Sequence, residues 1–175
     1  MQLLKAGEIA IKDACAIFDL FDLDLMEAFL KLDYRVCTTI HVVDEITDSD
    51  QLENITKLIS SNRILVDNIG TYEDIQVLVS ENSGLSFADC SVVEFAIRNT
   101  CTILSSDGSL RKISYRKGLT VHGMIWIIEA LVINKIISID IAIDKLNRYK
   151  SVNSRAPKKE VDDLINNFVL QKYKI

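Results

Sequence analysis

Residues 85–108, LSFADCSVVEFAIRNTCTILSSDG, decide the fold of this chain. Ser86 is a good N-cap, and the apolar residues after it predict the buried face of a helix over residues 87–98. The β-branched stretch TCTILS at residues 100–105 then predicts a strand, and the pair Asp107–Gly108 predicts a turn. A helix that leads directly into a strand is the repeating unit of α/β proteins.

The same alternation continues on both sides of this block. Strands separated by helices pair in parallel through right-handed crossovers, so the pattern predicts an α/β fold. We expect a three-layer α/β/α sandwich with a mostly parallel central sheet of about five strands, plus C-terminal helices. The predicted strands are residues 8–12, 34–40, 64–69, 100–105 and 119–122. The predicted helices are residues 14–32, 41–60, 72–81, 87–98, 109–116, 124–134, 139–149 and 158–173.

Length and composition favour one domain with a helical tail. The chain has 175 residues, of which 49% are hydrophobic and 26% charged, and a single Pro and six Gly are unlike a disordered chain. Residues 151–157, SVNSRAP, are the linker candidate. Residues 1–150 are therefore expected to form the main domain. Residues 151–175 would form a linker and a helix packed on that domain or on a partner.

Composition also argues against several classes of protein. The apolar stretch at residues 124–133 contains Glu129 and is too short to span a bilayer, so we expect a cytoplasmic protein with no membrane partner. The four cysteines form no CxxC pair and are interpreted as buried free thiols. The two histidines have no partner at metal-ligand spacing, which argues against zinc. No P-loop or GxGxxG motif supports nucleotide hydrolysis or dinucleotide binding.

Charge is divided unevenly along the chain. Residues 1–107 hold 7 Lys and Arg against 19 Asp and Glu, whereas residues 108–175 hold 13 against 6. An acidic half can host divalent cations and a basic half can hold a polyanion. The alternative is that both sets of charges only solvate helix faces.

Four acidic residues are predicted to lie at one edge of the sheet. Asp13 directly follows the first strand, and Asp107 lies just after the fourth. Glu45 is in the first turns of the helix after the second strand, and Asp89 is in the first turn of the helix capped by Ser86. Parallel strands end at a common edge, so these carboxylates are expected to meet. Crowded carboxylates repel unless a cation is bound, and Mg²⁺ or Mn²⁺ prefers oxygen ligands.

Each of these acids also has an ordinary structural explanation. Aspartate is a common helix cap, Asp89 is favoured at its helix N-terminus without any metal, and Asp107–Gly108 is a normal turn pair. Other acids are equally available, and only the topology ranks them lower: Asp19, Asp22, Asp24 and Asp67. From the residues alone, a metal site and a set of helix caps both remain open.

Four segments occur in the order and spacing of a known family. They are IKDACAIFDL at residues 11–20, HVVDEIT at residues 41–47, LSFADCSVVEFA at residues 85–96 and ILSSDGSLRKISYRKGLTVHG at residues 103–123. Each contains one of the four acids, and together they resemble a PIN domain over residues 8–123. Residues 124–175 are similar, less specifically, to the helical tail of some bacterial PIN-like proteins.

The resemblance implies a function and a site. The likeness is to bacterial toxin ribonucleases, which implies a divalent-metal-dependent endoribonuclease with an RNA substrate, an antitoxin protein as partner, and a homodimer. Some family members carry a further acid after the fourth one, but residues 108–111 hold none here, which leaves one ion as an alternative to two. Ser105, where the family usually has Thr, would orient one of the ligands. The implied catalytic residues and ligands of Mg²⁺ or Mn²⁺ are Asp13, Glu45, Asp89 and Asp107.

A short basic helix follows the fourth acid. Arg111, Lys112, Arg116 and Lys117 are expected to contact RNA phosphates, and the alternative is a solvated basic helix face. Two other functions remain open besides the ribonuclease. One is a PIN-like nucleic-acid-binding or regulatory module with little catalytic activity. The other is a metal-dependent phosphatase acting on small substrates.

Overall fold

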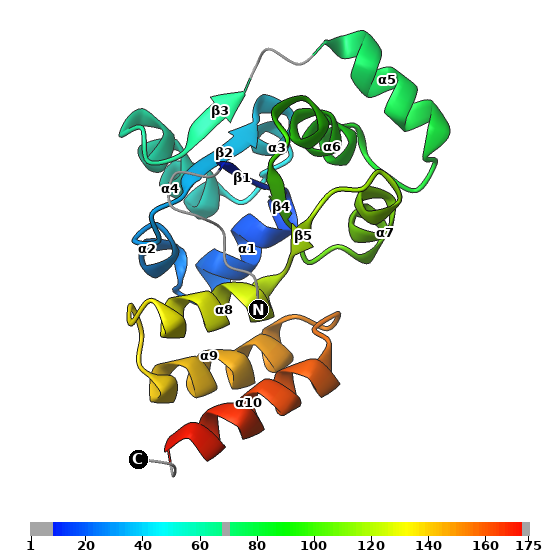
Figure 1. The fold of residues 1–175 in the computed structure, drawn as a ribbon. Coiled ribbons are helices and arrows are strands. Elements are labelled where there is room, and N and C mark those ends of the chain that lie inside the picture. The colour runs from blue at the N-terminus through cyan, green and yellow to red at the C-terminus, as the bar shows by residue number, and fades with distance from the viewer. Residues whose placement is uncertain (1–8, 68–70, 173–175) are drawn as a thin grey trace.

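A computed structural model describes residues 9–67 and 71–172 of this chain, which has an α/β fold (Figure 1). Five short strands pair in the order β3-β2-β1-β4-β5, and every pairing is parallel. The strands are β1 (Ile9–Lys12), β2 (Arg35–Thr39), β3 (Leu65–Asp67), β4 (Thr102–Leu104) and β5 (Val121–His122). The predicted α/β class with parallel pairing is confirmed, although the strands are shorter than predicted. Glu8, Asn68, Ile69 and Tyr173, at the ends of predicted elements, lie outside the described residues.

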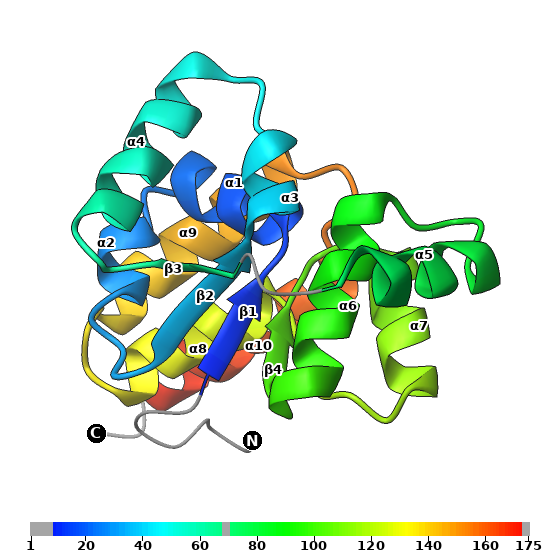
Figure 2. The same ribbon diagram turned by 90° about the horizontal axis from the view of Figure 1, so that it is seen from above.

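Helices lie on both sides of this sheet (Figures 1 and 2). Helix α6 packs on β1, β2 and β4, whereas α8 packs on α1 and α2. Helix α9 packs on α8, and α10 packs on both α8 and α9, so the last helices stack on one side of the molecule (Figure 1). The helices are α1 (Ala14–Asp22), α2 (Met26–Phe29), α3 (Ile40–Asp44), α4 (Ser49–Ser60), α5 (Tyr72–Glu81), α6 (Phe87–Asn99), α7 (Gly108–Arg116), α8 (Met124–Ile133), α9 (Ile139–Val152) and α10 (Lys158–Lys172). None of these described helices is both long and apolar enough to cross a membrane.

The apolar residues that predicted the helices form one core. Ile17 and Leu20 on α1, Ile103 and Leu104 on β4, and Leu131 on α8 are fully buried. Burial of each such side chain contributes roughly 1.5–3 kcal/mol, which outweighs the weak intrinsic preferences of these short segments. The core therefore fixes the strand ends, and with them the positions of the polar residues that follow.

The strand order reverses between β1 and β4. The chain steps outward from β1 to β2 to β3, then crosses back to β4 on the far side of β1. Such a switch point leaves a crevice beyond the carboxyl ends of the two central strands. Lys12 and Leu104 are paired in register, and the backbone N–H of Asp13 donates to the carbonyl of Leu104 at 3.3 Å. The next residue of each strand, Asp13 and Ser105, therefore reaches the crevice at the same level.

Two predicted helices are each divided in the structure. The predicted helix over residues 14–32 is broken near Asp24, which has a positive φ of 52° between α1 and α2. The predicted helix over residues 41–60 is broken after α3, where Glu45 is the C-cap. Helix α4 starts anew because the Asp48 side chain accepts a hydrogen bond from the Gln51 backbone N–H at 2.8 Å. Glu45 therefore ends a one-turn helix instead of starting a long one.

Candidate metal site at the carboxyl edge of the sheet

Asp13 lies at the centre of the carboxyl edge of the sheet. It is the N-cap of α1, and its Oδ1 accepts a hydrogen bond from the Ala16 backbone N–H at 2.8 Å. Its Oδ2 accepts a hydrogen bond from the Ser105 hydroxyl, directly across the switch point. Both side chains are buried, with exposed fractions of 2% for Asp13 and 0% for Ser105. The Ser105 Oγ also accepts from the Asp107 backbone N–H at 3.0 Å, so one hydroxyl joins the end of β1 to the loop that carries Asp107.

The pKa of Asp13 shows that three carboxylates interact at this edge. Burial raises the pKa of Asp13 from 3.8 to about 7, and the hydrogen bonds from Ser105 and Ala16 oppose that rise. The negative charges of Asp89 and Asp107 raise it further. Three acids from distant parts of the chain, at the starts of α1, α6 and α7, therefore lie within electrostatic range of one another.

Asp89 and Asp107 are both engaged as helix caps. Asp89 forms a capping box with Ser86, in which each side chain accepts from the other's backbone N–H at 3.0 Å. Burial raises the pKa of Asp89, and the charge of Asp107 adds to the rise. Asp107 Oδ1 accepts from the backbone N–H groups of Ser109 and Leu110, each at 2.9 Å. The caps predicted as an alternative to the metal site are therefore present, and they also hold the carboxylates in place.

Cys15 lies within electrostatic range of four carboxylates. It is a half-buried free thiol on the first turn of α1, while the other three cysteines are buried and free. Burial raises the pKa of Cys15 to about 12, with further contributions from the charges of Asp13, Asp107, Asp89 and Asp19 in that order. Asp19 is thus a fourth carboxylate near the site, and the sequence ranked it among the less probable candidates.

Asp19 ties the loop between α9 and α10 to the site. Its side chain is only 6% exposed, and its Oδ2 accepts from the Ser106 hydroxyl at 2.6 Å. Its Oδ1 accepts from the Asn153 amide at 2.8 Å. The same loop carries Arg155, whose guanidinium lies 3.3 Å from Asp107 Oδ2. The loop therefore lies at the end to which the strand arrows point (Figure 2).

Removal of the Asn153 amide is expected to destabilise the protein. Asn153→Ala leaves the buried carboxylate of Asp19 with one hydrogen bond fewer, and such a loss costs about 1–3 kcal/mol. Urea unfolding of the variant should report that decrease in the free energy of unfolding. Asn147→Ala, at an exposed position of the same helix, is the matched control and should change little. Equal losses in both variants would contradict the role assigned to Asn153.

Glu45 takes its position from the end of the short helix α3. It is exposed at the C-cap of α3, and no hydrogen bond or ion pair within residues 9–67 and 71–172 joins it to Asp13, Asp89 or Asp107. In the same described part of the chain, no three carboxylate, imidazole or thiol groups are arranged as ligands of one ion. The donor chemistry nevertheless fits a hard cation, because mutually repelling carboxylate oxygens are what Mg²⁺ and Mn²⁺ bind.

Of the four predicted RNA-binding residues, Arg111 lies nearest the site. Its Nη1 donates to the Ser105 carbonyl at 3.1 Å and its Nη2 to the Tyr115 hydroxyl at 3.0 Å. Lys117 instead forms an ion pair of 2.9 Å with Glu81 on α5. Lys112 and Arg116 are exposed. Contact of these residues with RNA stays a prediction.

Comparison with known proteins supports the family resemblance. A family model described as PIN domain matches residues 9–168. Among solved structures, the crystal structure of PAE2754 from Pyrobaculum aerophilum is similar, with a TM-score of 0.49 and 17% sequence identity over 73% of this chain and 96% of that chain. No curated protein matches the sequence significantly. The assignment to a family therefore rests on the sequence match over nearly the whole chain.

Proposed function

The chain belongs to the PIN domain family, whose members are generally nucleases, and we propose that it is a divalent-metal-dependent endoribonuclease. The observation that carries this proposal is the meeting of Asp13 with Ser105 at the switch point, within electrostatic range of Asp89 and Asp107. A crevice at this place is where α/β folds bind ligands. The acids predicted as ligands thus lie at the switch point between β1 and β4, where the topology also predicts a binding crevice.

The proposed ligands of Mg²⁺ or Mn²⁺ are Asp13, Asp89 and Asp107, with Glu45 as a fourth member of the set. A bound divalent cation lowers the pKa of a coordinated water and stabilises the leaving oxygen of a phosphodiester. Hydrogen bonds from neighbouring residues fix the orientation of the carboxylates that would bind the cation. The Ser105 hydroxyl and the Ala16 N–H fix both oxygens of Asp13, and the helix caps fix Asp89 and Asp107.

Other parts of the proposal follow from the family resemblance alone. They are a role as the toxin of a toxin–antitoxin pair, an antitoxin protein as partner, a homodimeric assembly and a cytoplasmic location. A second candidate function is a nucleic-acid-binding PIN module with little catalysis. The engagement of Asp89 and Asp107 in helix caps favours that candidate, because the caps and Arg155 compete with a cation for the same oxygens.

Replacement of Asp107 by Asn tests the proposed nuclease. Asn is as good an N-cap as Asp, so α7 should keep its start while the site loses one anionic oxygen. We expect Mn²⁺-dependent cleavage of a single-stranded RNA to fall about 100-fold or more, because even outer-shell partners of metal ligands contribute up to about that much. Asp48→Asn is the matched control, since Asp48 makes the same kind of cap at the exposed start of α4.

Two outcomes of this experiment would decide between the candidates. Cleavage that is abolished by a chelator and by Asp107→Asn, but not by Asp48→Asn, supports the nuclease. RNA binding by the wild-type protein with no cleavage in Mg²⁺ or Mn²⁺ would instead support the binding module. Cleavage that persists unchanged in the Asp107→Asn variant would remove Asp107 from the proposed site.

A further inference from the structure

A large pocket lies beyond the carboxyl end of the edge strand β5. Its volume is about 830 Å³, which is in the range of sites that bind small ligands. Helices α7 and α8 and the C-terminal helices all contribute to its walls. The lining residues that matter here are Ser106, Arg111, Tyr115, His122, Trp126 and Glu129.

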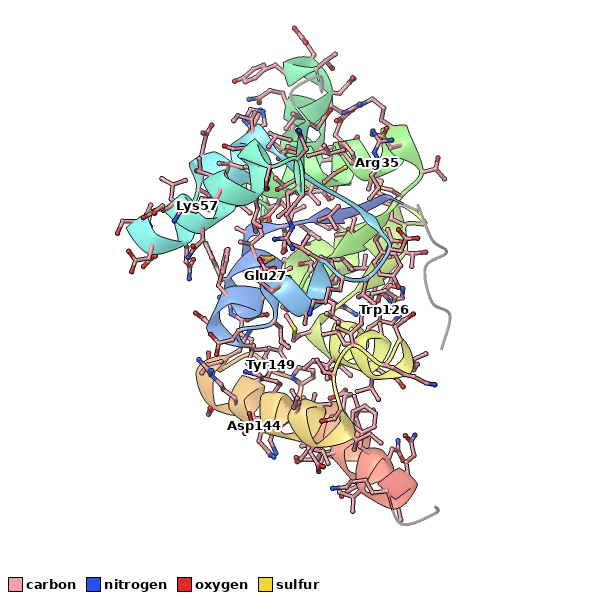
Figure 3. All side chains as sticks on the ribbon, turned by 90° about the vertical axis from the view of Figure 1, so that its left-hand side faces the viewer. Glu27, Arg35, Lys57, Trp126, Asp144 and Tyr149 are labelled. Atoms are coloured by element: carbon pink, nitrogen blue, oxygen red, sulfur yellow. The ribbon has the colours of Figure 1, made fainter. Side chains whose placement is uncertain are left out.

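The pocket shares two lining residues, Ser105 and Ser106, with the surroundings of the acidic site. Ser105, which donates to Asp13, lines it, and so does Ser106, which donates to Asp19. Ser106 also lines a smaller pocket of about 240 Å³ that Asp19 and Asp107 share. The Tyr149 hydroxyl lies 3.5 Å from the Ser106 hydroxyl, at the boundary where α9 meets the helices that cover the sheet (Figure 3). The two pockets therefore adjoin at Ser106, next to the acids.

Aromatic rings form one wall of this pocket. His122 and Trp126 are stacked with their ring centroids 4.2 Å apart and their planes 3° apart. Burial lowers the pKa of His122, and the positive charge of Arg111 lowers it further, so the imidazole is neutral near pH 7. Tyr115 is 54% exposed on α7. Rings in this setting suit the unstacked bases of single-stranded RNA, which bind on aromatic side chains.

Arg111 is the cation among the charged residues that line the pocket, and the other two are the carboxylates of Glu129 and Glu160. Its hydrogen bonds to the Ser105 carbonyl and the Tyr115 hydroxyl use only part of its fork of N–H donors. Gly123 leaves room for the guanidinium, because a Cβ at this position would lie 3.2 Å from Arg111 Nη1. A guanidinium held in this way loses little freedom when it binds a phosphate.

We propose that this pocket binds one nucleotide of single-stranded RNA beside the bond cut at the acidic site. Arg111 binds the phosphate of that nucleotide, and its base packs at the His122–Trp126 wall. Glu129 also lines the pocket, and a carboxylate accepts hydrogen bonds from the exocyclic amino group of a base but repels a phosphate. The pocket therefore prefers cytosine to uracil. This inference rests on the proposed function, since it places the nucleotide next to a cleavage site.

Trp126 allows the pocket to be tested without cleavage. It is the single tryptophan of the chain and is 7% exposed in the pocket wall, so its fluorescence reports this site alone. The probes are cytidine 5′-monophosphate, uridine 5′-monophosphate and a short single-stranded oligoribonucleotide, each titrated with a chelator present. We expect a saturable change in fluorescence, with tighter binding of the cytidine than of the uridine nucleotide.

Variants inside and outside the pocket separate a specific site from general charge attraction. Arg111→Gln should weaken binding about tenfold, because a charge-assisted hydrogen bond to phosphate contributes about that much. Arg35→Gln removes the same charge from an exposed position at the start of β2, outside the pocket lining, and should change binding less than about twofold. If Arg111→Gln fails to fold, Gly123→Ala keeps the charge but displaces the guanidinium and should also weaken binding.

The outcomes of this test are independent of the cleavage assay. No saturable change with any probe, or equal weakening by Arg111→Gln and Arg35→Gln, would overturn the nucleotide pocket. A protein that cuts RNA yet shows no change at Trp126 would also overturn the pocket and leave the nuclease standing. Specific nucleotide binding in a protein that never cuts RNA would support the pocket and overturn the nuclease.

Discussion

Replacement of Asp13 by Asn is expected to abolish RNA cleavage and, without metal at pH 8, to stabilise the protein by about 4 kcal/mol. Burial raises the pKa of Asp13 from 3.8 to about 7 in the folded state. Between these two pH values the folded protein keeps a proton that the unfolded chain has lost. Stability therefore falls as pH rises through that window, and the whole cost is present above the folded pKa.

The Asn side chain avoids this cost and keeps much of the local structure. Its oxygen can still accept from the Ala16 N–H, and its amide can donate to the Ser105 hydroxyl. Urea unfolding at several pH values checks the prediction. The gain in the free energy of unfolding should be largest near pH 8 and should vanish below about pH 4.

Asp48→Asn again serves as the control, because it makes the same chemical change at an exposed cap. That variant should not gain stability at pH 8, because Asn and Asp are comparable N-caps. A destabilised Asp13→Asn protein at pH 8, or one that still cleaves RNA at the wild-type rate, would contradict the account of Asp13.

Addition of Mn²⁺ is expected to raise the Tm of the wild-type protein at pH 8 by about 5–10 °C, and to leave the Asp13→Asn variant nearly unchanged. A ligand at a hundred times its dissociation constant stabilises the folded state by about 2.7 kcal/mol, and each kcal/mol shifts the Tm of a chain of this size by about 2–4 °C. The cation would replace the repulsion between Asp13, Asp89 and Asp107 by attraction.

The same measurement at pH 5.5 provides a second check. Below the folded pKa of Asp13 a proton competes with the cation, so the rise in Tm should be smaller. Ca²⁺ and Mg²⁺ can be compared with Mn²⁺ in the same way. A rise in Tm that is equal in the wild type and the Asp13→Asn variant would show that the ion binds elsewhere.

Local signals in the sequence predicted the α/β class and the placement of Asp13 and Asp107 just after strand ends. The alternation of helices and short strands gave the parallel α/β class, and Ser86 starts α6 as its capping pattern predicted. Asp13 and Asp107 were placed by the rule that parallel strands end at one edge. These predictions succeed because helix caps and strand ends depend on neighbours within a few residues.

Residues that depend on local breaks or distant contacts were harder to place. Glu45 was assigned to the start of a long helix because the Asp48 cap, with Gln51 three residues later, was overlooked as a new helix start. Asn153 and Asp19 are 134 residues apart and meet only through the packing of α9. Arg155 reaches Asp107 by the same route. Such contacts between distant residues cannot be predicted from the periodicity or the motifs of a single sequence.

A crystal structure of the wild-type protein soaked in Mn²⁺ tests the central claim most directly. The account predicts an ion at the switch point, bound by carboxylate oxygens of Asp13, Asp89 and Asp107 at about 2.0–2.3 Å, with Arg155 displaced from Asp107. The same map would show whether Glu45 joins the ligand set, directly or through a water. An ion bound away from Asp13, Asp89 and Asp107, or no ion at this edge at saturating Mn²⁺, would contradict the proposed site.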